Sequence, residues 1–158
     1  MNVHIDNKSV LFFKACEDIW AAERTLIGSP NIAVWHCTQA VEKILKGFLY
    51  CHNIPYDGSH DLDPLLEEVM AVTKLSDECK SNILNLNIYK SGLRYKNMSN
   101  DPSQEDAQLA ISRTKSIIQE FNSISKISQF MDEAQEVYTK MLKSNYKKYA
   151  DADIFGDT

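Results

Sequence analysis

The chain has 158 residues, of which 44% are hydrophobic and 25% are charged, and its formal net charge is −5. This length and composition are typical of one globular domain that needs neither a metal nor a disulfide to fold. The negative charge argues against a broad basic surface for nonspecific binding to long nucleic acid, and no apolar run reaches the roughly 20 residues of a membrane span.

Helical periodicity runs through the whole chain. We expect a first helix over residues 8–27, ended by the Gly28-Ser29-Pro30 break, and a second helix over residues 31–53. A loop with proline and glycine follows at residues 54–59. The core candidates of the first helix include Val10, Phe13, Ile19 and Trp20.

The second half of the chain predicts three or four further helices. The third covers residues 60–74 with Asp63-Pro64 as its cap and first turn, and the fourth follows Ser76 and runs toward Tyr89. We expect a loop at residues 94–101 and a fifth helix that Asp101 caps, with Pro102 and Gln104 in its first turn. Residues 103–153 contain neither glycine nor proline, which indicates one very long helix or two helices with a bend near residues 123–128.

These elements predict an all-α fold, an up-and-down bundle of about five helices with a C-terminal helical extension. We expect a single domain over residues 1–158, with the core at 8–130, the extension at 131–150 and a tail at 151–158. The apolar residues of the segment 130–149 suit packing on the same chain or on a partner. The N-terminus lacks a signal-peptide pattern, so we expect a cytoplasmic protein without membrane contact.

One set of polar side chains stands out on the second helix. His36, Gln39, Lys43, Lys46 and Tyr50 are spaced alternately three and four residues apart, so they form one narrow line on a helix, called here the polar line. The other side of this helix is widely apolar, which predicts a central helix. Two interpretations remain open, a solvated edge or one wall of a groove that binds an anion.

Other candidate sites are weaker. His60 beside Asp61 is either an oriented base or part of a helix entry, and the basic and aromatic segment 89–96 is either a phosphate contact or a helix end. No sequence motif of a metal site, a phosphate-binding loop or a nucleophilic triad occurs, so we expect no catalytic residue, metal or cofactor. The four cysteines are widely spaced, and we expect them to be small buried hydrophobic residues.

Three blocks in this order resemble the HEPN family (higher eukaryote and prokaryote nucleotide-binding domain). The first is the segment 39–46, QAVEKILK, the second is His60-Asp61-Leu62, and the third is the block from Tyr89 to Arg94-Tyr95. The resemblance covers about residues 8–125. It implies a bundle of about five helices that is usually a homodimer and associates with nucleotides or RNA. Bacterial and archaeal members are often encoded beside a small nucleotidyltransferase, and some of these pairs act as toxin–antitoxin modules.

Many members of this family are metal-independent RNases that carry an arginine followed, after four to six residues, by a histidine. None of the three arginines, Arg24, Arg94 and Arg113, has a histidine at that spacing. We therefore expect a binding protein without catalysis, whose groove for a nucleotide, an RNA end or an acidic partner is formed by Gln39, Lys43, Lys46, His60, Arg94 and Tyr95. Two alternatives remain open, a divergent RNase that uses His60 and a dimeric protein-interaction module.

Overall fold

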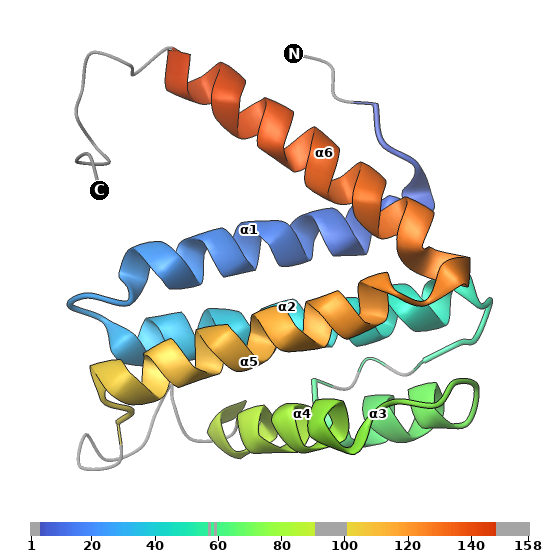
Figure 1. The fold of residues 1–158 in the computed structure, drawn as a ribbon, viewed down its shortest axis with the longest axis horizontal. Coiled ribbons are helices and arrows are strands. Elements are labelled where there is room, and N and C mark those ends of the chain that lie inside the picture. The colour runs from blue at the N-terminus through green and yellow to red at the C-terminus, as the bar shows by residue number, and fades with distance from the viewer. Residues whose placement is uncertain (1–3, 57, 59, 91–100, 148–158) are drawn as a thin grey trace.

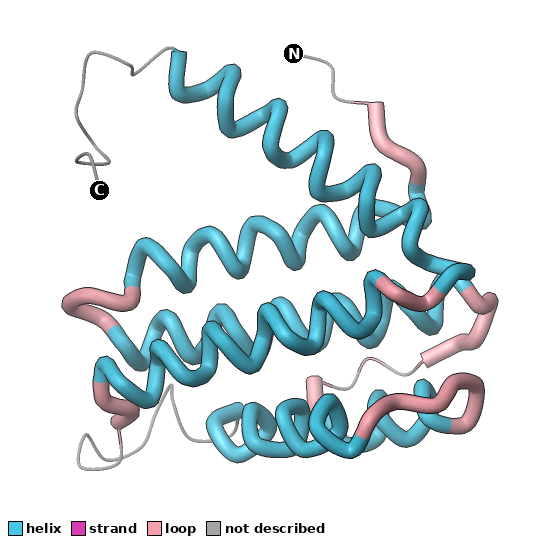
Figure 2. Tube along the Cα trace, viewed as in Figure 1, coloured by secondary structure: helices cyan, strands magenta, loops and turns pink. Residues whose placement is uncertain are grey.

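The computed structural model describes residues 4–56, 58, 60–90 and 101–147, and within these ranges every regular element is a helix (Figure 2). This confirms the predicted all-α fold. The expected tail at 151–158 and all but the last residue of the expected loop at 94–101 lie outside the described residues. The elements are η1 (Asn7–Ser9), α1 (Val10–Thr25), α2 (Pro30–Cys51), α3 (Leu62–Met70), α4 (Asp77–Lys90), α5 (Gln104–Asn122) and α6 (Ser125–Lys147).

Helix α2 is the centre of the bundle. It contacts every other helix, and Figure 1 shows it side by side with α1 and α5, while α3 and α4 pack along one edge. Helix α1 lies close to α2 at Gly47, where an added Cβ would lie 2.7 Å from a ring carbon of Phe12 in α1. A glycine at this position therefore lets α1 and α2 pack tightly.

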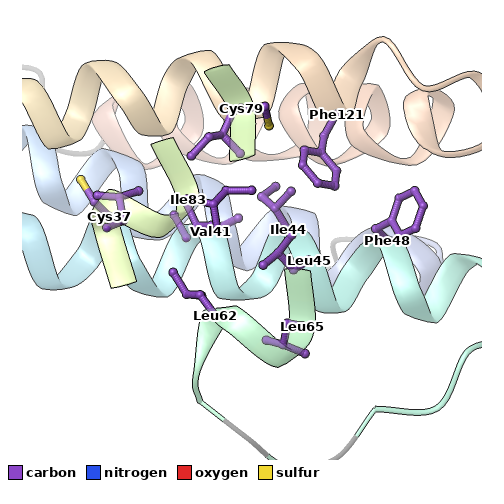
Figure 3. Packing of buried hydrophobic residues seen from close by; sticks show 14 of the residues in the cluster. Cys37, Val41, Ile44, Leu45, Phe48, Leu62, Leu65, Cys79, Ile83 and Phe121 are labelled. Atoms are coloured by element: carbon purple, nitrogen blue, oxygen red, sulfur yellow. The ribbon is translucent and has the colours of Figure 1, made fainter. Parts of the chain in front are cut away.

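The core is formed where the wide apolar face of α2 meets α3, α4 and α5. Figure 3 shows Val41, Ile44 and Leu45 facing side chains of the neighbouring helices, and all three are at most 2% exposed. The rings of Phe48 and Phe121 join α2 to α5 edge to face, with centroids 5.9 Å apart. The burial of the apolar side of α2 confirms its predicted central place.

Two helix starts differ from the sequence prediction. Helix α3 begins at Leu62, and its N-cap is Asp61, not Asp63, because the Asp61 carboxylate accepts a hydrogen bond from the Asp63 backbone N–H. Helix α5 begins at Gln104 with Ser103 as its N-cap, not Asp101, and Ser103 forms a reciprocal capping box with Asp106. In both regions the sequence contains two candidate N-cap residues only two positions apart.

The predicted core residues of α1 are confirmed in part. Phe13 and Ile19 are partly buried and pack against the core, and Trp20 is partly buried, whereas Val10 is 36% exposed and is not a core residue. The buried line of α1 instead comprises Phe12, Ala15, Asp18 and Ala22. The two alanines in this line suit a close approach of α1 to α2.

The C-terminal stretch forms two helices, as one of the two alternatives predicted. Helix α5 ends at Asn122 and α6 begins at Ser125, within the expected bend. Helix α6 packs on α1 of the same chain, where Tyr138 is 8% exposed and lies edge to face on Phe13 with centroids 5.5 Å apart. None of the helices in the described part of the chain is long and apolar enough to cross a membrane.

Candidate functional site

The polar line runs along one edge of α2, between its neighbours α1 and α3. Tyr50 at its end is exposed, whereas the other four residues are half-buried. Both lysines and His36 are bonded to carboxylates. The line is therefore neither a purely solvated edge nor a row of unpaired cations.

The first of two charged clusters joins α1 to α2. The carboxylate of Asp18 is bonded through one oxygen to Nδ1 of His36, at 2.9 Å, and through the other to Nζ of Lys43. Asp18 lies on the buried line of α1, and its side chain is only 10% exposed. A buried carboxylate is costly unless it is paired, so His36 and Lys43 stabilise Asp18 in this position.

The second cluster joins α2 to the segment that enters α3. Oε1 of Glu42 accepts a hydrogen bond from Nζ of Lys46 at 2.6 Å and lies 2.9 Å from Nδ1 of His60. Its other oxygen lies 3.5 Å from Nε2 of Gln39. The Glu42 side chain is 6% exposed, so this carboxylate too is a buried charge surrounded by partners.

Local structure around His60 explains how it reaches Glu42. Asp61 caps α3, and Leu62 is fully buried in the core. The amide of Asn87 in α4 accepts a hydrogen bond from the Leu62 backbone N–H and donates one to the Asp61 carboxylate at 2.9 Å. These contacts fix the backbone at Asp61 and Leu62, directly after His60, and so place the His60 side chain within hydrogen-bonding distance of Glu42.

The two clusters place negative charge inside and positive charge outside. The Lys43 side chain is 29% exposed against 10% for Asp18, and Lys46 is 13% exposed against 6% for Glu42. The two carboxylates balance the charge of the two ammonium groups. An ammonium group has three donors, so a lysine that is bonded to one carboxylate retains donors for an anion.

Four of the six predicted ligand residues lie along this edge of the bundle: Gln39, Lys43, Lys46 and His60. Arg94 and Tyr95 lie outside the described residues, so the groove between Lys43 and Arg94 stays a prediction. The ligand-binding role of the other four also stays a prediction.

Sequence reasoning did not identify the two carboxylates that organise the site. Asp18 had a detectable signal, because it falls on a helical stripe with Ala15 and Ala22, where a charged residue needs a partner. Glu42 had one as well, because it lies four residues before Lys46 and beside buried positions of α2. Neither signal shows which residues on other helices complete the cluster.

The cysteine thiols are free. Cys37, Cys51 and Cys79 are buried as predicted, whereas Cys16 is only partly buried. Burial raises the pKa of Cys16 and Cys37 to about 11 and that of Cys79 to about 12. These thiols are protonated at neutral pH and are not activated nucleophiles. Within the described ranges, no group of three or more His, Cys, Asp or Glu side chains is placed to hold a metal ion.

Comparison with known protein families gives a match over most of the chain. The model of the HEPN domain matches residues 9–124, which is most of the chain and includes both charged clusters. No curated protein and no solved structure matches the chain significantly.

Proposed function

The chain belongs to the HEPN domain family, and from this we propose that it binds a nucleotide or an RNA end through the polar line of α2. The observation that carries the proposal is the layered arrangement of charge. Lys43 and Lys46 are held on a rigid helix by the carboxylates beneath them. Because both side chains are already ordered, binding a phosphate costs less side-chain entropy than ordering two exposed lysines would.

Three residues of the polar line have distinct roles in this proposal. Lys43 and Lys46 donate hydrogen bonds to phosphate oxygens, since their ammonium groups are compact charges with several donors. The Gln39 amide contacts the sugar or the base. Arg94 and Tyr95 complete the site by pairing with a second phosphate and stacking on a base, a role that rests on the family resemblance alone.

We also propose that the protein acts by binding, as a homodimer that pairs with a small nucleotidyltransferase. The family's arginine–histidine spacing is missing at Arg24, Arg94 and Arg113, which supports binding without cleavage. The homodimer and the nucleotidyltransferase partner rest on the family resemblance alone. Size-exclusion chromatography with light scattering measures the oligomeric state, and a monomer at all concentrations contradicts the homodimer. Copurification with a small nucleotidyltransferase, where one is encoded beside this chain, tests the second partner.

We expect the double variant Lys43→Gln/Lys46→Gln to bind AMP and a short 5′-phosphorylated RNA at least tenfold more weakly than the wild type. A hydrogen bond between charged groups contributes about 1.5 kcal/mol or more, which corresponds to about this factor for a single contact. Fluorescence anisotropy of a labelled RNA measures the affinity at low and high salt, and the salt dependence is expected to fall with the lost lysines.

The matched control is Lys140→Gln/Lys143→Gln on α6, which removes the same charge from an exposed surface. Lys140 is bonded to Glu136 four residues earlier, as Lys46 is to Glu42. Circular dichroism confirms that each variant is folded. Equal loss of affinity in both double variants would show that only net charge matters and would contradict a specific site at the polar line.

One observation favours a second function, metal-independent RNA cleavage. His60 Nδ1 is bonded to the buried carboxylate of Glu42, while 81% of the His60 side chain is exposed. A carboxylate that orients a histidine in this way is the arrangement of a general base. His60 would take the proton of a 2′-hydroxyl that attacks the adjacent phosphorus, and Lys46, bonded to the same Glu42 oxygen, would return a proton to the departing 5′ oxygen.

Incubation of the purified protein with RNA in the presence of EDTA distinguishes binding from cleavage. The binding proposal expects intact RNA. The control is His52→Ala, because His52 is bonded to a backbone carbonyl and not to a carboxylate. Cleavage that is lost in His60→Ala and retained in His52→Ala would establish the RNase function instead.

A further inference from the structure

Trp35 lies one helical turn before Gln39, at the N-terminal end of the edge of α2 that carries the polar line. With about 100° between successive positions of a helix, Trp35 lies about 40° from Gln39 and about 20° from Lys46 around the axis of α2. Its side chain is half-buried, so part of the indole ring reaches the surface. Trp35 therefore extends the row of Gln39 and Lys46 by one turn with a large aromatic ring.

The first charged cluster contacts this ring. The indole of Trp35 lies edge to face with the His36 ring, with centroids 4.9 Å apart and an angle of 68° between the planes. His36 is bonded through Nδ1 to Asp18, whose other carboxylate oxygen is bonded to Lys43. One buried carboxylate thus connects, through His36, the Trp35 ring with the ammonium group of Lys43.

The spacing of these residues along α2 matches the order of the parts of a nucleotide. At a rise of about 1.5 Å per residue, Gln39 lies about 6 Å beyond Trp35, and Lys43 lies about 6 Å beyond Gln39. An aromatic face stacks on a base, an amide can bond to a sugar hydroxyl or a base edge, and an ammonium group binds phosphate. Base, sugar and phosphate would then lie in this order from the N-terminal end of α2.

Tyr50, at the opposite end of the polar line, suits a base less well. It is 45% exposed, so stacking a base on it costs more side-chain entropy than stacking on a ring that already packs on His36. The three residues between Lys46 and Tyr50 are buried and offer no polar side chain to a sugar. The N-terminal end of the polar line is therefore the better place for the base.

We propose that Trp35 is the stacking residue of the nucleotide site, so that the base lies on its indole ring and the phosphate reaches Lys43. This inference rests on the proposed binding of a nucleotide or an RNA end at the polar line, and it gives the ligand a direction along α2. It does not depend on Tyr95, which lies outside the described residues. Since every base has an aromatic face, Trp35 adds affinity without selecting one base.

Calorimetry with AMP and with ribose 5-phosphate measures what the base adds, because the two ligands share a sugar and a phosphate. The wild type is expected to bind AMP at least about fivefold more tightly, the lower end of the gain from stacking one base. In Trp35→Leu the affinity for AMP falls to that for ribose 5-phosphate, which itself stays unchanged. Trp35→Phe keeps an aromatic ring and retains part of the preference. The matched control Tyr50→Leu retains all of it.

Tryptophan fluorescence locates the base independently, because the chain has two tryptophans. In Trp20→Phe only Trp35 emits, and AMP and the 5′-phosphorylated RNA are expected to quench this emission in a saturable way. In Trp35→Phe only Trp20 of α1 emits, whose ring lies 5.0 Å from the guanidinium of Arg24, and its emission is expected to stay unchanged.

The outcomes separate this inference from the proposed function. If the wild type binds neither AMP, ribose 5-phosphate nor the RNA, the nucleotide site and the stacking role fail together. Equal affinity for AMP and ribose 5-phosphate, a preference that survives in Trp35→Leu or disappears in Tyr50→Leu, or unquenched Trp35 emission overturns the stacking role alone. Circular dichroism checks the fold of each variant. The fluorescence of Trp20→Phe decides the question if Trp35→Leu does not fold or if the wild type binds RNA alone.

Discussion

Glu42→Gln is expected to lower the free energy of unfolding by about 3 kcal/mol. Removing one partner of a buried ion pair leaves the other charge buried without compensation, which typically costs about 3–5 kcal/mol. Lys46 is only 13% exposed, so water replaces the lost carboxylate only in part. The substitution also removes the charge that orients His60. Chemical denaturation monitored by circular dichroism measures the effect.

The chain contains a matched control for this substitution. Glu136 and Lys140 on α6 form a bridge with the same four-residue spacing, with N–O distances of 2.7 Å against 2.6 Å for Glu42 and Lys46. Both side chains of the α6 pair are about two-thirds exposed, at 66% and 65%. Glu136→Gln is therefore expected to leave the midpoint of unfolding unchanged. Equal effects of the two substitutions would contradict the view that Glu42 is a buried organising charge.

A double substitution separates charge from packing at this position. In Glu42→Leu/Lys46→Met both charges are removed together, so no ion stays buried alone. Replacing a buried ion pair with apolar side chains of similar size is often neutral for stability. We expect the double variant to be more stable than Glu42→Gln and to lose anion binding, since Lys46 is absent.

Phe121→Ala is expected to cost about 3–5 kcal/mol of stability, the usual range for truncating a buried phenylalanine. The Phe121 ring is fully buried and packs edge to face on Phe48, which joins α5 to α2 (Figure 3). A loss of this size is a large part of the stability of a domain. Thermal or urea denaturation measures it, and Phe130→Ala, at a partly exposed site on α6, serves as the control with a smaller loss.

A double-mutant cycle with Phe48→Ala tests the contact itself. We expect the two losses to be non-additive by about 0.5–1.5 kcal/mol, the coupling of an aromatic pair beyond its burial. Additive losses would show that each ring contributes only through its own burial and that the edge-to-face contact adds nothing.

The sequence predicts the helices well because their signals are local. The break at Gly28-Ser29-Pro30 is confirmed, with Pro30 in the first turn of α2. Of the two alternatives for the C-terminal stretch, the structure has the one with two helices, and α5 ends at Asn122. The wide apolar face of α2 identifies it as central because burial of that face needs neighbours on several sides. These inferences depend on spacing within one helix.

The helix caps were harder to predict because two candidates lie within a few residues of each other. In the segment Asp61-Leu62-Asp63-Pro64, Asn87 of α4 bonds to both carboxylates and to the Leu62 backbone, and Leu62 enters the core as the first residue of α3. Ser103 rather than Asp101 caps α5, and the preceding Pro102 is buried. Contacts between helices select one cap, and periodicity does not reveal them.

The site could be predicted only in part for a similar reason. The line from Gln39 to Lys46 follows from helical spacing, but the bond of Lys43 to Asp18 joins residues 25 positions apart and depends on how α1 packs against α2. The line therefore looked like a row of lysines, whereas the structure shows lysines held by buried carboxylates. The charge that an anion meets is smaller than the sequence indicates, and the lysines are better ordered.

NMR chemical-shift mapping with AMP and a short 5′-phosphorylated RNA tests most directly whether the polar line of α2 is the ligand site. The predicted result is a set of saturable shifts at Gln39, Lys43, Lys46 and His60, with little change on α6. Shifts centred on Lys140 and Lys143, or no saturable shifts with either ligand, would contradict the account and leave the two charged clusters a purely structural role.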